Sequence, residues 1–436
     1  MILNLIHSVV FGTPTLVLIL LAFLFLNLNS RFIGIRKIGA AIKAVFKSDS
    51  NSGINSPVSA AFVSLSATVG TGNIVGVAGA ITLGGPGAVF WMWISALLAM
   101  TVKFSEIYLS SLFKKEGSVY SYIYKVIKSD ILRRTFLIFG IIAAVSIGNL
   151  TQTNAAATAA AIALDGISTS NTAVRFFLGM AFFAASFLLL KREAAAVRFC
   201  EKFLPLMAAF YIILCAAALF RMREAVGGVF LQIIKGAFCP RAVTAGAVGS
   251  VVKAIKPGVA RGVFSNEAGL STAAIAYEKN SAEPEKAALF GIFEVFVDTI
   301  VLCSLTALVV LSSGTVTYGE DLGAYTTLCA FIGILGKRSL PIFCLVVCFF
   351  AFSSVIGWGV YVRRFAEKLK ISPAIILPVY CAVCMPGAVF KTAAVWQIAE
   401  MGSIFMMSIN CTALIKHRES LSYKQLRYKY RGHGKK

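Results

Sequence analysis

Long apolar runs recur along the whole chain and dominate its pattern of hydrophobic and polar positions. A helix needs about 20 mainly apolar residues to cross the hydrocarbon core of a bilayer. Eleven runs approach or exceed that length: 12–29, 57–82, 87–112, 136–164, 172–190, 203–220, 243–276, 288–312, 339–362, 373–390 and 393–415. The pattern therefore predicts an all-α polytopic membrane protein with eleven transmembrane helices.

Composition supports this interpretation and excludes a soluble globular protein. Of the 436 residues, 58% are hydrophobic and only 14% are charged, whereas a soluble domain carries about 25% charged residues. The net charge of +22 would suggest a nucleic-acid partner in a soluble protein. Here the basic residues lie between the apolar runs, so we expect no nucleic-acid partner and attribute the excess to membrane topology.

The distribution of Lys and Arg predicts how the chain is oriented in the membrane. With the N-terminus outside, the inner segments hold 29 basic residues and the outer segments hold 7. The inner segments are 31–47, 113–134, 191–202, 278–286, 363–370 and 416–436. An excess on the inner side follows the positive-inside rule. We expect a plasma or inner membrane protein with its N-terminus outside, its C-terminus cytoplasmic and its first helix retained.

Glycines interrupt the second apolar run. Gly70, Gly72 and Gly76 occur in the string Thr-Gly-Thr-Gly-Asn-Ile-Val-Gly, which is a poor helix interior. Unwound backbone at membrane depth is tolerated where it is buried in protein or lines a cavity. Its free carbonyls can face a cation, and its helix N-terminal amides can face a carboxylate. We expect the substitution Gly72→Ala to cut transport strongly, although a packing role for Gly72-x-x-x-Gly76 fits the pattern about as well.

A second interrupted run begins five spans later. Run 243–276 contains Pro257 and several glycines, together with the polar residues Arg261, Asn266 and Glu267. Two five-span halves of opposite topology, each opening on a broken helix, are typical of inverted-repeat secondary transporters. We therefore predict four parts: an extra helix with a basic loop (1–56), a first repeat (57–222), a second repeat (223–415) and a basic tail (416–436).

Polar residues inside other runs are further candidates for function. Asn149, Gln152 and Asn154 lie in run 136–164, where interhelical hydrogen bonding and substrate contact are equally good explanations. Asp298 is an intramembrane carboxylate and so a functional candidate, but a structural ion pair with Lys253, Lys256 or Arg261 explains it as well. The adjacent hydroxyls of Ser353 and Ser354 can ligate Na⁺ or bond back to their own helix.

Other chemistries have little support in the sequence. The three histidines lie outside the apolar runs, which argues against a histidine proton relay. Cys381 and Cys384 form a C-x-x-C inside an apolar run, but no second pair completes a metal site. Neither a P-loop nor a G-x-S-x-G motif is found, and the segments between runs are short. We therefore do not expect an enzyme.

Four motifs resemble signatures of the alanine or glycine:cation symporters. Residues 66–106, SATVGTGNIVGVAGAITLGGPGAVFWMWISALLAMTVKFSE, form the longest of them. The others are RGVFSNEAG at 261–269, FVDT at 296–299 and FSSVIGW at 352–358. After the last motif the family usually has Y-Y-G-E, whereas this chain reads V-Y-V-R. The chain thus resembles a divergent member of the family.

The resemblance implies a LeuT-type 5+5 inverted repeat preceded by one extra helix. It also implies import of small neutral amino acids, chiefly alanine and glycine, coupled to Na⁺ and in some members to H⁺. Glutamine-preferring members occur, and a transport-inactive sensor is a further alternative. The positions implied for substrate are Thr71, Gly72, Asn73, Gln152, Phe264 and Trp358, and those for Na⁺ are Ala67, Gly70, Ser353 and Ser354. Asn266 and Asp298 remain additional candidates.

Overall fold

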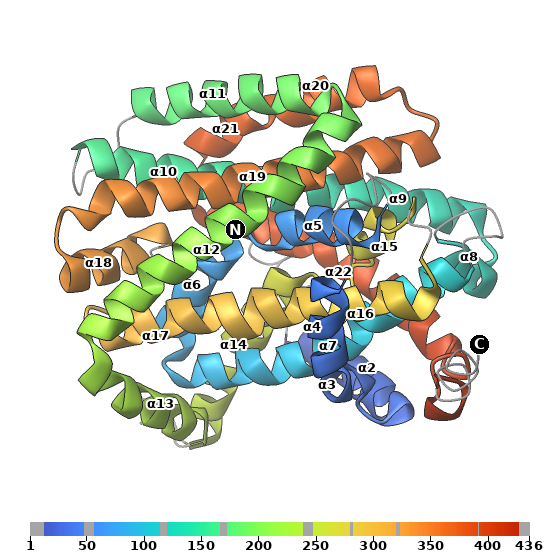
Figure 1. Cartoon of the computed structure of the whole chain (residues 1–436), viewed down its shortest axis with the longest axis horizontal. Helices are drawn as coiled ribbons and strands as arrows, with labels where there is room; N and C mark the ends of the chain where they lie inside the picture. The colour runs from blue at the N-terminus through green and yellow to red at the C-terminus, as the bar shows by residue number, and fades with distance from the viewer. Residues whose placement is uncertain are drawn as a thin grey trace.

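The computed structural model describes residues 13–47, 56–113, 120–165, 172–238, 247–279, 282–319, 323–390 and 392–426. All regular elements in these ranges are helices (Figure 1). In the N-terminal part they are α2 (Thr13–Ser30), α3 (Ile33–Arg36), α4 (Ile38–Phe46), α5 (Pro57–Thr68), α6 (Val75–Gly84), α7 (Gly87–Leu112), α8 (Ser121–Ile127), α9 (Asp130–Val145), α10 (Thr151–Asp165), α11 (Thr172–Leu190) and α12 (Glu193–Arg221). They continue as α13 (Arg223–Phe238), α14 (Ala247–Asn266), α15 (Thr272–Ala276), α16 (Pro284–Val295), α17 (Ser304–Ser312), α18 (Ala324–Leu335), α19 (Ser339–Lys368), α20 (Pro373–Ala382), α21 (Cys384–Val389) and α22 (Thr392–Lys416).

Each of the eleven predicted apolar runs coincides with one helix or with a pair of helices. Six helices in the described ranges are long and apolar enough to cross a membrane, or seven when the bent pair α5–α6 counts as one span. Shorter apolar helices cover Pro14–Ser30, Ala324–Leu335, Pro373–Val389 and Ser403–Lys416. The chain is thus an all-helical protein with several candidate spans, and the count of eleven crossings stays a prediction.

Two segments between the predicted apolar runs also contain helices. Segment 221–241 contains α13, and segment 313–338 contains α18. In Figure 1 both helices lie at one end of the molecule, opposite α8, α15 and the C-terminus. Counting apolar runs does not predict these two helices, because they are shorter or more polar than a membrane span.

Two helices contain π-helical segments, which the sequence did not reveal. Ser146–Leu150 joins α9 to α10, and Phe296–Cys303 joins α16 to α17. A π turn inserts an extra residue into a helix and often occurs at functional sites. Both segments carry candidate residues, namely Asn149 in the first and Asp298 in the second.

Three of the six predicted inner segments lie together. Glu193 accepts hydrogen bonds from Lys279 at 2.7 Å and from Arg364 at 3.0 Å. Arg364 also donates to the carbonyls of Ile275 and Ala276, both at 2.8 Å, so it ties α15 to the start of α12. Lys368 pairs with Glu278. Segments 191–202, 278–286 and 363–370 therefore share one end of the molecule.

The start of the basic tail also contacts a predicted inner segment, 31–47. The guanidinium carbons of Arg31 and Arg36 lie 4.6 and 5.0 Å from the ring centre of Tyr423. Leu421 and Leu426 are buried. The described part of the tail is thus packed onto the segment that follows α2.

The orientation of this end can be tested by labelling. Gln425 is exposed and lies in the tail, so a cysteine placed there with Gln425→Cys will be accessible from one side only. If the tail is cytoplasmic, a membrane-impermeant maleimide will label it in inverted vesicles and not in intact cells, relative to the background from the native cysteines. Labelling from outside intact cells would reverse the orientation.

Candidate functional site

The first break in the fold lies between α5 and α6. Helix α5 begins at the cap residue Ser56, whose Oγ accepts a hydrogen bond from Ser59 N, followed by Pro57 at the first helical position. It ends at Val69, which is extended, and Gly70 follows with φ −141° and ψ −155°. A single 3₁₀ turn over Thr71–Asn73 then leads into α6, and the axis bends by 56°. The break predicted at the glycine cluster is confirmed.

Helix α19 lies against this break with its two serines. Ser354 Oγ donates to the carbonyl of Val69 at 3.4 Å. A Cβ on Gly70 would lie 2.3 Å from Ser354 Oγ. Further along α19, a Cβ on Gly357 would lie 2.6 Å from Ala67 N. Ser353 Oγ is buried and has no hydrogen-bond partner within the described ranges. The structure thus brings Ser354 against Gly70 and places α19 against Ala67, whereas no hydrogen bond joins Ser353 to the break in the part of the chain that the structure describes.

Gln152 caps the other side of the break. Its Oε1 accepts hydrogen bonds from both Thr71 N and Thr71 Oγ1 at 2.9 Å. The neighbouring amides bond to other helices instead. Asn149 Nδ2 donates to Tyr380 O of α20 at 2.7 Å, and Asn154 Nδ2 donates to Gly387 O of α21 at 3.0 Å. Of the two explanations left open for this polar string, interhelical bonding holds for Asn149 and Asn154, whereas Gln152 reaches the break.

Asn73 and Asp298 form the polar centre of the site. Asn73 Nδ2 donates to Asp298 Oδ1 at 2.7 Å, and its Oδ1 accepts from Gly70 N at 3.0 Å. The other carboxylate oxygen, Asp298 Oδ2, accepts from Ser265 Oγ at 2.9 Å and Thr299 Oγ1 at 2.8 Å. All four side chains are buried. A residue pair 225 positions apart therefore joins the first break to the π-helical segment Phe296–Cys303.

The second break lies between α14 and α15. Three residues in it have left-handed backbone: Glu267 with φ 55°, Gly269 with φ 96° and Ser271 with φ 60°. Asn266 stabilises the turn, because its Oδ1 accepts a hydrogen bond from Ala268 N at 3.1 Å. The interruption predicted in run 243–276 is thus confirmed, and Asn266 is part of the break itself.

Glu106 of α7 holds this second break in place. Its Oε1 accepts hydrogen bonds from Gly269 N at 2.8 Å, Ser271 N at 3.0 Å and Asn410 Nδ2 at 2.6 Å. Backbone amides that leave a helix need other acceptors when they are buried. Glu106 provides one for two of them, and sequence inspection alone did not single it out.

A buried ion pair lies beside the same break. Lys103 Nζ is 3.6 Å from Glu294 Oε2 and donates to the carbonyl of Asn266 at 3.0 Å. Glu294 also accepts hydrogen bonds from Ser64 at 2.5 Å and Tyr277 at 2.6 Å. Lys103 is thus the buried cation of this region and pairs with Glu294.

The ion-pair explanation offered for Asp298 is not supported. Lys253 and Lys256 are exposed. No ion pair joins Asp298 to either lysine or to Arg261 in the part of the chain that the structure describes. The nearest neighbours of the carboxylate are instead the neutral donors on Asn73, Ser265 and Thr299. Burial among neutral donors leaves the carboxylate without a counter-ion in direct contact.

The two aromatic residues predicted to contact the substrate, Phe264 and Trp358, have different surroundings. Trp358 is fully buried, and a Cβ on Gly148 would lie 2.2 Å from its Cγ, so the indole packs on the π-helical segment Ser146–Leu150. Phe264 is half-buried on α14, one residue before Ser265. A Cβ on Gly72 would lie 3.8 Å from Ser265 Cα. Phe264 therefore belongs to the stretch of α14 that faces the first break, whereas the contact of Trp358 is with the segment Ser146–Leu150.

Several residues of this region escaped the sequence analysis. Thr306 Oγ1 donates to Asn73 O at 2.7 Å. Thr327 Oγ1 donates at 3.1 Å to Ile74 O, which also accepts a hydrogen bond from Ala78 N. Ser265 and Thr299 were also missed, although each lies in a motif that we had recognised. Small hydroxyl side chains are frequent in membrane helices, and only tertiary contacts single these four out.

Comparisons with known proteins agree with the geometry. A profile of the sodium:alanine symporter family matches residues 1–433. The chain is 34% identical to the sodium/alanine symporter AgcS of Methanococcus maripaludis over 91% of its own length and 90% of the relative. It is 31% identical to the amino-acid carrier protein AlsT of Bacillus subtilis, covering 87% and 81%. It is 28% identical to the probable sodium/glutamine symporter GlnT of the same organism, covering 92% and 84%. The chain belongs to the sodium:alanine symporter family, whose members are membrane transporters.

Proposed function

We propose that the protein is a secondary active symporter that imports small neutral amino acids, alanine and glycine, coupled to Na⁺ by alternating access. The observation that carries this proposal is the contact between the first break and α19. Backbone at Val69 and Gly70 meets Ser354 there, with Ser353 one residue before it on α19, next to a second polar centre at Asn73. Family membership and the similarity to AgcS support the same function.

The proposed ion site consists of neutral oxygens. Ala67 and Gly70 contribute backbone carbonyls, and Ser353 and Ser354 contribute hydroxyls. Ser353 Oγ is buried without a partner in the described ranges, which is costly for a hydroxyl unless a ligand uses it. Because none of these groups carries a full charge, the empty site is tolerable in the membrane. Such a site can release its ion inside the cell, as a symport cycle requires.

Loss of one hydroxyl will test the ion site. We expect Ser354→Ala to raise the Na⁺ concentration for half-maximal uptake about tenfold, or about 1.4 kcal/mol, the order of one lost ligand interaction. Na⁺ titration of uptake into proteoliposomes measures this directly. Ser408→Ala on α22 is a matched control, because Ser408 is exposed, and it will leave the Na⁺ dependence unchanged. An unchanged Na⁺ dependence in Ser354→Ala would remove this serine from the site.

The proposed substrate site lies between the two breaks. We assign Thr71, Gly72 and Asn73 to its first side, Phe264 to its second side, and Gln152 and Trp358 to its support. Amides freed at a helix break can receive a substrate carboxylate. Gln152 and Asn73 already fix the conformation of the turn through Thr71 and Gly70. A preformed turn lowers the ordering cost of binding.

The substrate and the ion can be identified together. Uptake of radiolabelled alanine, glycine, serine and glutamine is measured in proteoliposomes with an inward Na⁺ gradient, and repeated with choline in place of Na⁺. We expect alanine and glycine uptake that choline abolishes. Preferential glutamine uptake would place the protein with GlnT-like relatives, and uptake driven by a pH gradient in choline would make H⁺ the coupling ion. Binding without uptake of any substrate would indicate a sensor.

A further inference from the structure

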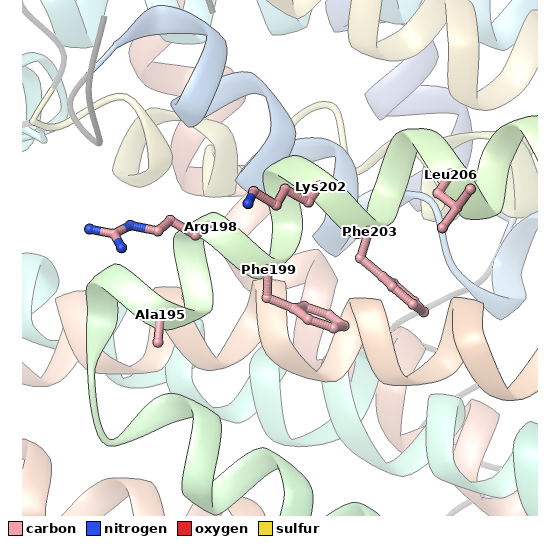
Figure 2. A pocket seen from close by; sticks show the side chains of 6 residues that line it. All are labelled: Ala195, Arg198, Phe199, Lys202, Phe203 and Leu206. Atoms are coloured by element: carbon pink, nitrogen blue, oxygen red, sulfur yellow. The ribbon is translucent and has the colours of Figure 1, made fainter. Parts of the chain in front are cut away.

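A shallow depression lies on the outer face of α12, away from the site described above. It has a volume of about 310 Å³. Six side chains line it, all from the first half of α12: Ala195, Arg198, Phe199, Lys202, Phe203 and Leu206 (Figure 2). The helix itself is long and apolar enough to cross a membrane. The depression therefore lies on a surface that lipid can reach.

One part of this depression is apolar and firmly supported. The rings of Phe199 and Phe203 stack with their centres 4.6 Å apart. Phe199 packs edge-on against Phe352 at 5.5 Å, and Phe203 packs against Phe349 at 5.1 Å, both from α19. Leu206 continues the apolar surface and is 68% exposed. The floor is thus held by α19 and needs no rearrangement to receive an acyl chain.

The other part carries two cations one helical turn apart. Arg198 and Lys202 are exposed, and their nitrogen ends point away from the phenylalanine rings in Figure 2. No ion pair involves either of them in the part of the chain that the structure describes. The acid between them, Glu201, accepts a hydrogen bond from Ser59 of α5. Both cations therefore remain available to an anion, although Glu201 lowers the local net charge.

We propose that this depression binds an anionic phospholipid, with its phosphate on Arg198 and Lys202 and an acyl chain along Phe199, Phe203 and Leu206. Residues 198–206 cover about 12 Å of helix axis at 1.5 Å per residue, so one lipid can reach both parts. Basic pockets on the cytoplasmic side of membrane helices recognise such headgroups. Segment 191–202 is one of the segments predicted to be cytoplasmic, where anionic lipids attract basic residues.

The test uses the purified full-length protein in neutral detergent, where no membrane surface potential attracts lipid. Native mass spectrometry follows the binding of dioleoylphosphatidylglycerol and, separately, of dioleoylphosphatidylcholine. We expect wild-type protein to bind the anionic lipid more tightly. The double variant Arg198→Gln, Lys202→Gln will weaken that binding about tenfold or more, because two charged contacts to phosphate are lost.

A matched control removes the same charge from the same segment. The double variant Lys191→Gln, Arg192→Gln alters exposed residues outside the depression and will bind the anionic lipid as wild type does. The variant Leu206→Asn will weaken binding of both lipids, because it removes the apolar contact and not the charge. Inorganic phosphate at 100-fold excess over the lipid will not displace the anionic lipid, because phosphate lacks an acyl chain.

Four outcomes would overturn the proposal. These are unchanged affinity for the anionic lipid in the Arg198 and Lys202 variant, equal affinity of wild-type protein for the two lipids, an equal loss in the control variant, and displacement by phosphate. None of these measurements depends on transport, so failure of the proposed symport activity would leave the lipid assignment intact. Circular dichroism of each variant confirms that the helices have formed.

Discussion

We expect Gly70→Ala to lower the rate of amino-acid uptake by about 30-fold. A Cβ at this position would lie 2.3 Å from Ser354 Oγ and 2.8 Å from Gln152 Oε1. Neither atom can move without loss, because Gln152 Oε1 accepts two hydrogen bonds from Thr71. Overpacking of this kind costs about 2 kcal/mol, which corresponds to about 30-fold in an equilibrium. Initial rates in proteoliposomes, normalised to the reconstituted protein, measure the effect.

Gly72→Ala adds a methyl group to the same turn without such a clash. A Cβ on Gly72 would meet Ser265 Cα at 3.8 Å, which is an ordinary contact, and Gly72 is not among the residues with positive φ. Since no overpacking results, any loss of uptake in this variant will come from the proposed substrate site, and we expect it as a higher alanine concentration for half-maximal uptake rather than as loss of folded protein. If Gly72→Ala abolishes uptake while Gly70→Ala preserves it, the steric argument for the break is wrong.

Asp298→Ala will reduce uptake at least about tenfold. The substitution removes the acceptor for Asn73 Nδ2, Ser265 Oγ and Thr299 Oγ1. The hydroxyls can rotate toward other acceptors. Asn73 Nδ2 keeps its hydrogen bond to the backbone carbonyl of Asp298 at 3.0 Å but loses the shorter one to the carboxylate, and a buried N–H without its acceptor costs about 1–3 kcal/mol. Because Asn73 also fixes Gly70, we expect the first break to lose its conformation. The readout is maximal uptake rate together with the Na⁺ dependence.

Asp298→Asn separates the charge of this residue from its hydrogen bonds. The amide keeps an oxygen for Asn73, and the hydroxyls of Ser265 and Thr299 can reorient to accept from its nitrogen. We expect a lower maximal rate with the Na⁺ dependence retained. If Asp298→Asn loses the Na⁺ dependence while Ser354→Ala keeps it, Asp298 is the ion-coupling residue and the proposed ion site is wrong.

The helices and both breaks were predictable because their signals are local. Apolar length marks each candidate span, and the glycines at 70, 72 and 76 or the polar string Asn266–Glu267 mark an interruption within one run. The pairing of Ser353 and Ser354 with the first break was expected only through resemblance to a family. The structure places Ser354 in contact with Gly70.

The tertiary partners could not be predicted from local patterns. Asn73 meets Asp298 across 225 residues, and Lys103 meets Glu294 rather than leaving a cation for Asp298. Glu294 and Asp298 lie one helical turn apart, so sequence spacing alone cannot decide which of them pairs with Lys103. The π-helical segment Phe296–Cys303 also shifts the helix face on which Asp298 lies. Only the packed arrangement distinguishes these alternatives.

The contacts of Arg364 have a consequence for hydration. Its guanidinium is buried on the carbonyls of Ile275 and Ala276 and on Glu193. Any arrangement that parts α15 from α19 uncovers the two carbonyl oxygens and the guanidinium at once. Polar groups without partners are tolerated only when water solvates them. Opening at this end therefore requires water to enter together with the movement of the helices, so a dry intermediate with these bonds broken is the least favourable point along that path.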